Sequence, residues 1–412
     1  MVRETKAGQQ YRYLIEGRTK ALLESGEVGL HAVEGEEYFY RPGELLVAPE
    51  AVPALIDYLA QRGIAPPAVD EVVGVGVITL PADADGHEVL LELRKVAGLG
   101  PDAVGPHHVL FGTPKWFGSP ARPPAVAKPV AIGEGEPRGA GVLVAVIDTG
   151  QAESSLGGAW ESGHVRAAPD DLDPLDADAD GTLDFEAGHG TFIAGIIAQV
   201  APGAEVLAIA ALSPSGITDD LTAARAVLKA RAAGASILNL SFGGYAEGDA
   251  MPLALLRALD AGCDDSFVVV AAAGNDGLSR EFFPAAMPGV VAVAALNASG
   301  RRAGFSNFGP WVEACADGDR LVSTFVTGKV MTDSDGDGQQ DVFEAPFAHW
   351  SGTSFAAPQV AGALAVRMAE TGESAADATQ SLIRDPALVR LPGIGTRIVT
   401  TVPSHRSGPG LP

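Results

Sequence analysis

Apolar residues follow two kinds of spacing between residues 41 and 112. Short alternating runs predict strands at 44–48, 72–80 and 108–111, and apolar positions three or four apart predict helices at 51–61 and 87–97. Five such elements within roughly 70 residues make a small α+β unit, close to the smallest size at which a domain folds alone.

Beyond residue 141, the predicted strands are apolar throughout. Runs rich in valine, isoleucine and alanine occupy 142–147, 205–210, 236–240, 267–272 and 290–294. Such runs are typical of strands buried on both faces of a parallel sheet. Helices are predicted among them at 219–233 and 252–261, and a longer one at 354–370; Asp219 and Gly234 suit the two ends of the first. This alternation predicts an α/β fold with a mostly parallel sheet and helices on both faces.

Composition separates these two units. Residues 113–140 contain six prolines and several glycines, which predicts an extended linker without a regular helix or central strand. We therefore place the small α+β domain at 41–112, the linker at 113–140 and the α/β domain at 141–403. Residues 1–40 are left unassigned, and 404–412 are expected to form a tail.

The charge of the chain limits its partners. Lys and Arg number 28 against 52 Asp and Glu, a net charge of −24, which argues against a nucleic-acid or anionic-membrane partner. Its apolar runs are far shorter than the ~20 residues of a membrane span, and no apolar leader follows Met1. We expect a monomer that stays in the cytoplasm or is exported by a route the sequence does not show. Cys263 and Cys315 are expected to be buried free thiols.

Three segments carry candidate chemistry. Ser354 stands in Gly-Thr-Ser-Phe-Ala-Ala-Pro (352–358), at the start of an apolar helix whose N–H groups could face an oxyanion. Asp148 follows the buried strand 142–147, where open α/β sheets usually hold their chemistry. His189 stands at the start of another apolar helix. A serine needs such a base before it becomes a useful nucleophile.

These segments resemble the subtilisin-like serine peptidases (subtilases). The likeness covers residues 141–400 and includes, in family order, 239–244 (Asn-Leu-Ser-Phe-Gly-Gly), 271–275 (Ala-Ala-Ala-Gly-Asn) and 305–310 (Phe-Ser-Asn-Phe-Gly-Pro). It implies a subtilisin-like fold and peptide-bond hydrolysis through an acyl-enzyme. It also implies the roles of nucleophile for Ser354, general base for His189, orienting carboxylate for Asp148 and oxyanion donor for Asn275. Phe192 and Gln359 stand where many members have histidine, and neither is a triad position.

The resemblance also suggests how peptides bind. It implies that a pocket for the side chain just before the scissile bond is walled by Ser241, Phe242, Gly243, Ala273 and Gly274. Phe282 or Phe283 is expected to narrow the floor of this pocket, which favours an apolar side chain. A backbone edge at Gly216 could pair with an extended polypeptide substrate by strand addition.

The unit at 41–112 resembles the inhibitory propeptide of subtilases, which feeds its last strand into the active-site cleft. The resemblance implies that this N-terminal domain is an intramolecular inhibitor of the enzyme formed by the rest of the chain. An ordinary accessory domain is the alternative. The adjacent His107 and His108 are expected to be structural, because neighbouring strand residues point apart.

Two acidic loops could hold calcium. The stretch 333–344 has the EF-hand spacing of oxygen ligands, with a glycine at its sixth position and no evident flanking helices. The stretch 176–184 repeats the first nine positions but has Ala187 where the last glutamate belongs. The alternative is that both are acidic surface loops. The candidate ligands are Asp333, Asp335, Asp337, Asp341 and Glu344 in the first loop, and Asp176, Asp178, Asp180 and Asp184 in the second.

Two other functions remain open. Asp148-Thr149-Gly150 also resembles the motif of aspartic peptidases, which need a second such motif or a dimer. The chain could also be a catalytically silent, calcium-stabilised binding protein.

Overall fold

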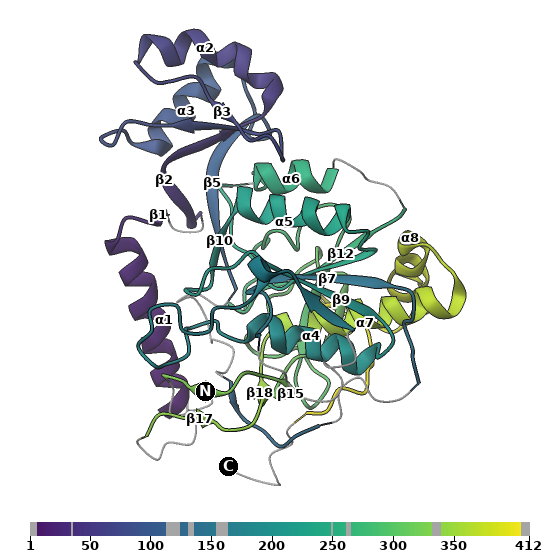
Figure 1. Ribbon diagram of the computed structural model, residues 1–412. Coiled ribbons are helices and arrows are strands. Elements are labelled where there is room, and N and C mark those ends of the chain that lie inside the picture. The colour runs from purple at the N-terminus through teal and green to yellow at the C-terminus, as the bar shows by residue number, and fades with distance from the viewer. Residues whose placement is uncertain are drawn as a thin grey trace.

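The computed structural model describes residues 6–33, 36–112, 124–130, 136–153, 164–248, 250–260, 265–331 and 339–404. These residues form two units, with the smaller N-terminal one standing on the larger (Figure 1). Within the described part of the chain, no helix has both the length and the apolar character needed to cross a bilayer.

The N-terminal unit is a sheet of antiparallel strands covered by two helices. Its strands lie in the order β5-β2-β4-β3, with β1 also paired to β2. Their bounds are β1 (Gly29–His31), β2 (Tyr38–Val47), β3 (Ala68–Val69), β4 (Gly76–Thr79) and β5 (Val104–Phe111); the helices are η1 (Pro49–Ala51), α2 (Val52–Gln61) and α3 (Gly86–Ala97). The core between sheet and helices contains Leu45, Leu55, Leu59, Ile78 and Leu90.

All three predicted strands of this unit differ from their bounds in the structure; the one expected at 108–111 is β5 and begins earlier, at Val104. The strand expected at 72–80 is shorter, because the Asp70 carboxylate accepts hydrogen bonds from the N–H groups of Val72 and Val73 at 3.1 and 2.7 Å and holds them in a turn. The strand expected at 44–48 is β2 and begins at Tyr38, because its first residues pair with β1.

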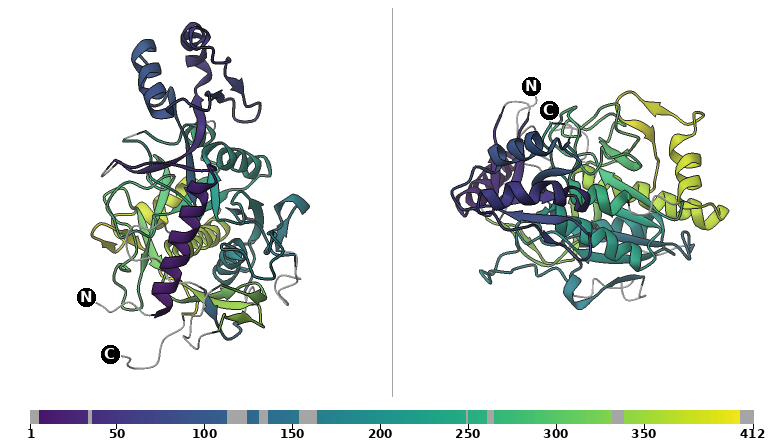
Figure 2. Two further views of the ribbon diagram at one scale, coloured as in Figure 1. Left: turned by 90° about the vertical axis from the view of Figure 1, so that its left-hand side faces the viewer. Right: turned by 90° about the horizontal axis from the view of Figure 1, so that it is seen from above.

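The unassigned first 40 residues contain a long helix. Helix α1 (Lys6–Glu24) buries Ile15, Thr19 and Leu22 on one side and lies along the larger unit (Figure 2). Leu22 joins Phe39, Phe111 and Ile217 in a small apolar cluster at the junction of the two units. Helix α1 therefore packs where β5 leaves the small unit.

The larger unit is built on a nine-stranded sheet of mostly parallel strands. Eight of its strands run parallel, from β8 to β20, and only β19 at the edge pairs antiparallel. In spatial order they are β19 (Arg390–Leu391), β20 (Gly395–Arg397), β14 (Ala314–Asp317), β13 (Val290–Leu296), β12 (Val268–Ala272), β11 (Ile237–Leu240), β7 (Leu143–Asp148), β9 (Glu205–Ala210) and β8 (Val165–Ala167). The central strands are buried on both faces, as their continuous apolar runs predicted.

Helices cover both faces of this sheet (Figure 1). One face packs against α4 (His189–Val200) and α7 (Thr353–Thr371), and the other against α5 (Asp220–Ala232) and α6 (Leu253–Asp260). The Asp219 side chain caps α5 by accepting a hydrogen bond from Thr222 N at 2.8 Å, and Gly234 follows with φ of 82°. The predicted α/β fold is confirmed, including the small unit that precedes it.

The remaining elements are short. They are β15 (Leu321–Thr324), β16 (Gly328–Lys329), β17 (Val342–Phe343), β18 (Phe347–Trp350), η2 (Pro169–Asp171), α8 (Ala375–Thr379), η3 (Gln380–Arg384), and β6 (Ala125–Val126), which lies within the predicted linker. Strand β6 pairs with β18 at the edge of a small sheet, where prolines nearby do not break a ladder. Cys315 is a buried free thiol, whereas Cys263 and the expected tail from residue 405 onward lie outside the described residues.

One sheet runs through both units. Strand β10 (Ile217–Asp219), which belongs to the larger unit, pairs antiparallel with β5, so that Ile217 lies opposite Phe111. Figure 1 shows β5 descending from the small unit to β10. The backbone of the small unit therefore reaches the carboxyl edge of the large sheet, where Asp148 ends β7.

Candidate active site

Asp148 and His189 form a buried pair. His189 opens α4, and its Nδ1 lies 2.7 Å from the Oδ1 of Asp148. Both side chains are buried, and the Asp148 carboxylate also accepts a hydrogen bond from Thr149 N at 2.8 Å. Burial disfavours the imidazolium, but the nearby charges of Asp148, Glu186 and Asp173 outweigh it and raise the pKa of His189. The site is therefore built to stabilise a positive charge on His189.

A second carboxylate holds the loop before His189. Asp173 accepts hydrogen bonds from Thr149 Oγ1 and Gly188 N, each at 2.8 Å, and Thr149 Oγ1 accepts one from Gly190 N at 3.1 Å. Burial raises the pKa of Asp173 to about 6, although these hydrogen bonds favour its ionised form. Nothing in the sequence pointed to Asp173, because only the fold brings it to Thr149.

Ser354 is the second residue of α7 and is buried. Its hydroxyl donates to the Ser241 carbonyl at 3.2 Å, and the Ser241 hydroxyl donates to the Ser354 carbonyl at 3.0 Å. The His189 ring packs 5.4 Å, centroid to centroid, from the ring of Phe355, the residue after Ser354. No hydrogen bond joins His189 to Ser354, although both are described, so the hydroxyl would have to turn away from Ser241 to meet the base. Catalytic hydrogen bonds are often long or misaligned without substrate and tighten when it binds.

The side chain of Asn275 is held by its oxygen, which leaves its amide nitrogen able to donate a hydrogen bond. Its Oδ1 accepts hydrogen bonds from Thr353 N at 2.8 Å and from Thr353 Oγ1 at 2.9 Å. Thr353 Oγ1 in turn accepts one from Gly274 N at 3.1 Å. With Oδ1 fixed in this way, Nδ2 is the group left to donate to an oxyanion near Ser354.

The end of β5 occupies the cleft beside Ser354. Phe111 and Gly243 exchange backbone hydrogen bonds of 2.8 and 2.9 Å, and Gly112 N donates to the Gly216 carbonyl at 3.0 Å. A pocket here is lined by Phe111, Gly112, Ser241, Phe242, Ala272, Gly274, Asn275, Asp276, Phe282, Thr353 and Ser354. An extended backbone thus lies between the 216 and 243 edges, next to the candidate nucleophile.

The expected pocket walls divide into three groups. Ser241, Phe242 and Gly274 line the pocket, while Gly243 and Gly216 contact β5 through their backbones. Ala273 does not line it, because its backbone turns toward β13 and its methyl group is buried behind the pocket. This corrects the expectation that Ala273 is a wall.

Phe282, and not Phe283, lines the pocket. A Cβ at Gly243 would lie 2.4 Å from the Phe282 ring, so glycine is needed there. Phe283 instead pairs its backbone with Gly244. Behind the pocket, Tyr245 donates to Asp276 at 2.8 Å, and Asn307 accepts from Asp276 N at 3.1 Å, a network that the sequence did not predict.

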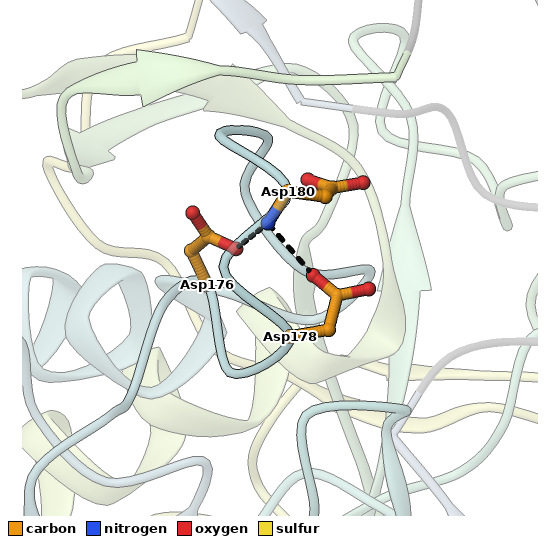
Figure 3. A group of neighbouring side chains, drawn as sticks. All are labelled: Asp176, Asp178 and Asp180. Atoms are coloured by element: carbon orange, nitrogen blue, oxygen red, sulfur yellow. Dashed lines mark hydrogen bonds between the residues drawn. The ribbon is translucent and has the colours of Figure 1, made fainter.

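The loop at 176–184 gathers three of its carboxylates. Ligand oxygens of Asp176, Asp178 and Asp180 all lie within 4.8 Å of one another, and Asp180 N donates to Asp176 and Asp178 (Figure 3). Asp184 is not in this group; it accepts from Ala177 N at 2.7 Å, and burial together with these three acids raises its pKa. An all-oxygen set of this size suits Ca²⁺, whose ligands at 2.3–2.6 Å lie no more than about 5 Å apart.

The loop at 333–344 can be placed only in part. Strands β16 and β17 pair antiparallel as the two strands of a hairpin, so the described residues next to this loop are strands and not helices. Asp341 and Glu344 are described, whereas Asp333, Asp335 and Asp337 lie outside the described residues.

Charged pairs join the two units around β5. His107 lies 2.7 Å from Glu44 through Nδ1 and 3.2 Å from Asp219 through Nε2. Arg94 contacts Glu247 at 2.7 Å, and Arg41 contacts Asp219 at 3.1 Å. His107 is thus structural and serves the junction.

Comparisons with known proteins agree with this fold. Residues 139–410 match a family model described as the subtilase family. The chain is similar to a thermophilic serine proteinase of Bacillus sp. (strain AK1), with 34% identity over 268 residues, 62% of this chain and 58% of that protein. It is also similar to thermitase of Thermoactinomyces vulgaris, with 32% identity over 250 residues, 58% of this chain and 78% of that protein. The match therefore spans little more than half of the first relative's length.

Two solved structures are also similar. A variant of the protease domain of PatA superposes with a TM-score of 0.51 and 26% identity, covering 64% of this chain and 94% of that one. Fervidolysin from Fervidobacterium pennivorans superposes with a TM-score of 0.58 and 21% identity, covering 90% of this chain and 61% of that one. The second likeness concerns the fold alone.

Proposed function

We propose, because the chain belongs to the subtilase family, that it is a serine endopeptidase using Asp148, His189 and Ser354. The observation that carries the proposal is the buried 2.7 Å contact between His189 and Asp148, beside a helix that begins with Thr353 and Ser354. The orientation of Asn275 supports it, since an oxyanion donor is useful only at such a site.

The reaction would follow from these positions. His189 takes the Ser354 proton while Oγ attacks the substrate carbonyl carbon, and Asn275 Nδ2 with Ser354 N stabilises the oxyanion. Collapse of this intermediate breaks the C–N bond, and His189 returns the proton to the leaving amine. Water then hydrolyses the acyl-enzyme by the same steps. Asp148 fixes the imidazole and stabilises its charged form throughout.

Polypeptides are the proposed substrates. The backbone of Phe111 and Gly112 between the 216 and 243 edges illustrates how an extended chain would bind, by adding a strand. We number substrate residues backward from the scissile bond, so that position −1 is the residue just before it. Phe282 closes the pocket at this position, which favours a small or moderate apolar side chain.

The N-terminal unit would act as an intramolecular inhibitor. Its last strand fills the cleft at Phe111 and Gly112, and α1 covers Phe111 through Arg18, whose guanidinium lies 5.5 Å from the Phe111 ring and donates to the Ser215 carbonyl at 3.2 Å. We assign the inhibitory domain to 41–112, the linker to 113–140 and the catalytic domain to 141–403, with a tail from 404. Cleavage within the linker would separate inhibitor from enzyme.

Calcium would stabilise the enzyme. Asp176, Asp178 and Asp180 would hold one ion, which supplies positive charge to a loop that otherwise gathers like charges. Asp184 closes this loop only five residues before His189, so ordering it would steady the approach to the base. The hairpin loop at 333–344 is proposed as a second site.

The experiment compares the purified full chain with a Ser354→Ala variant in the presence of calcium. We expect the wild type to be labelled by a fluorophosphonate, to hydrolyse an unfolded protein and to cleave its own linker, as seen by mass spectrometry. Ser354→Ala should lose all three, and a Ser279→Ala control at an exposed serine should keep them. Labelling and hydrolysis that persist in Ser354→Ala would contradict the proposal.

Two alternatives have distinct outcomes in this experiment. An aspartic peptidase would be blocked by pepstatin and would survive Ser354→Ala; the contact of Asp148 with His189 argues against it. A silent binding protein would bind calcium without labelling or hydrolysis by any variant.

A further inference from the structure

Asn307 is a buried polar residue beside the active site to which the proposed reaction gives no role. Its backbone N–H donates to the Gly274 carbonyl at 2.9 Å, and its side-chain Oδ1 accepts hydrogen bonds from Asp276 N at 3.1 Å and Leu278 N at 3.0 Å. Its own side chain is 0% exposed. A single residue therefore bonds to the chain on both sides of Asn275, the proposed oxyanion donor.

The segment that contains Asn307 lies along the turn at 274–278. Gly277 N, in this turn, donates to the Phe305 carbonyl at 2.7 Å. Gly274 has φ of +98°, and a Cβ there would lie 2.5 Å from Asn307 Nδ2. Glycine is therefore needed at 274 both for the turn and for the close approach of the Asn307 side chain.

Asn307 is itself fixed to the central sheet. The neighbouring Ser306 hydroxyl donates to the Asn307 carbonyl at 3.0 Å and accepts from Ala295 N, in β13, at 2.9 Å. On its other side, Asn307 Nδ2 donates to the Tyr245 hydroxyl at 3.4 Å. The turn at 274–278 is therefore held by a residue that is anchored to the sheet.

Asn275 needs two supports to place its Nδ2. The hydrogen bonds from Thr353 fix Oδ1, but they leave the amide able to pivot about that oxygen. The direction of Nδ2 then depends on where the backbone of 274–276 lies, and Asn307 holds that backbone. A donor stabilises the oxyanion only within about 2.7–3.1 Å, and a displacement of about 1 Å can cost a hundredfold in rate.

We infer that Asn307 is a positioning residue of the proposed active site: it holds the 274–278 turn so that Asn275 Nδ2 reaches the oxyanion. The inference rests on the proposed peptidase function and adds a residue to it. A buried asparagine that served stability alone would lower the melting temperature when replaced, but the molecules that stay folded would keep their kcat. The two roles therefore differ in kinetics and not in stability.

The first test measures kcat and KM on a peptide, with the calcium-loaded full chain after it has cut its linker and well below its melting temperature. Asn307→Leu is similar in size but has no acceptor. We expect its kcat to fall about ten- to a hundredfold, with little change in KM because the 216 and 243 edges still bind the substrate backbone. Asn307→Ala removes the same acceptor and replaces leucine if that variant does not fold.

Two further variants separate positioning from stability. Asn307→Asp keeps the acceptor and should keep most of the kcat, although its charge near Asp276 should lower the melting temperature. Thr396→Val also removes a buried hydrogen bond, from the Thr396 hydroxyl to the Ile383 carbonyl at 2.6 Å, and should lower the melting temperature without lowering kcat. If Asn307→Leu loses no more kcat than Thr396→Val, or no more than Asn307→Asp, the inference is wrong.

The second test asks whether Asn307 acts through Asn275. In an Asn275→Ala background no donor is left to position, so adding Asn307→Leu should change kcat by less than about twofold. A loss of the same size with and without Asn275 would mean that Asn307 affects the reaction by another route, and would overturn the inference.

The third test needs no activity. Crystal structures of Ser354→Ala, alone and with Asn307→Leu, should place Asn275 Nδ2 more than about 0.5 Å apart, which is the tolerance of a catalytic arrangement. Adding Thr396→Val instead should leave Nδ2 in place. If Nδ2 does not move in Asn307→Leu, Asn307 does not position it. A wild type that hydrolyses no peptide would contradict the proposed function, and these crystal structures would then decide the inference by themselves.

Discussion

His107 of the small unit lies 3.2 Å from Asp219 of the large unit, with the Nε2 of one facing the Oδ1 of the other. The same imidazole contacts Glu44 at 2.7 Å, so one buried histidine is held between two carboxylates from different units. Burial alone would lower the pKa of His107, but the carboxylates of Asp219 and Glu44 beside its two ring nitrogens raise it to about 9. The positive charge on His107, which depends on pH, therefore helps to hold the small unit against the large one.

The stability of the docked chain should fall at alkaline pH. Because the pKa of His107 is raised from 6.5, its contribution is fully present below about 6.5 and is lost as pH rises through about 9. The pKa of Asp219 is lowered from 3.8, so its contribution is present above that value and lost in strong acid. We expect the melting temperature to fall between pH 7 and 10 in Ser354→Ala and to fall by less when His107→Gln is added; a residual fall should remain, because the pKa of His189 is raised as well. A control at His164 should keep the wild-type profile, and identical profiles for His107→Gln and wild type would refute this account.

Asn275 should show separable effects on catalysis and stability. Asn275→Asp keeps the acceptor for Thr353 but removes the donor, so kcat should fall about a hundred- to a thousandfold with little change in melting temperature. Asn275→Ala removes both and should also destabilise the protein, because Thr353 N is buried. The measurements are peptide hydrolysis and thermal unfolding. Equal melting losses in both variants would mean that the Asn275 oxygen is not the stabilising group.

Thr149 should position His189 through its hydroxyl. Thr149→Val removes the hydrogen bonds with Asp173 and Gly190 and leaves the buried carboxylate of Asp173 short of a donor. We expect a loss of about 1–3 kcal/mol in the free energy of unfolding, measured in urea, together with reduced kcat. Thr149→Ser keeps the hydroxyl and should recover most of both. If serine recovers neither, the methyl group and not the hydroxyl is what matters.

Calcium should stabilise the chain through the three-aspartate group. At a hundred times its dissociation constant, a bound ion adds about 2.7 kcal/mol to stability, so chelation should lower the melting temperature. Asp178→Asn with Asp180→Asn should reduce this calcium response, whereas Asp170→Asn, an exposed acid outside the group, should not. A response unchanged in the double variant would exclude this loop and leave the hairpin loop as the proposed site.

The sequence predicted the five consecutive strands β13, β12, β11, β7 and β9 of the large sheet, but not β8, β14, β19 or β20. Strands such as 268–272 are buried on both faces, so every residue is apolar and the run is visible without knowing its neighbours. The cap of α5 was equally local, since Asp219 bonds to a residue three positions away.

What the sequence did not predict depends on distant contacts. The described buried residues of α1 include Thr19 beside Ile15 and Leu22, so the sequence shows no clear apolar stripe that would predict this helix. The helix is instead held by its contacts at the junction of the two units. Strand β6 exists because β18 offers an edge. In the site, Asp173 and Glu186 gain their surroundings only when the loop before α4 folds back on Thr149 and Gly216. Ala273 was misplaced because a motif gives the order of residues but not the direction in which each one points.

The pairing of β5 with β10 bears on what happens once the small unit leaves. When the small unit leaves, β10 (217–219) loses the strand with which it pairs. Its unpaired backbone could then bind any extended chain, including the strand β5 that was just released. If the small unit inhibits the enzyme as proposed, cutting the linker would leave it as a separate, competitive inhibitor. Lasting liberation of the enzyme would require that this competitor be digested or diluted.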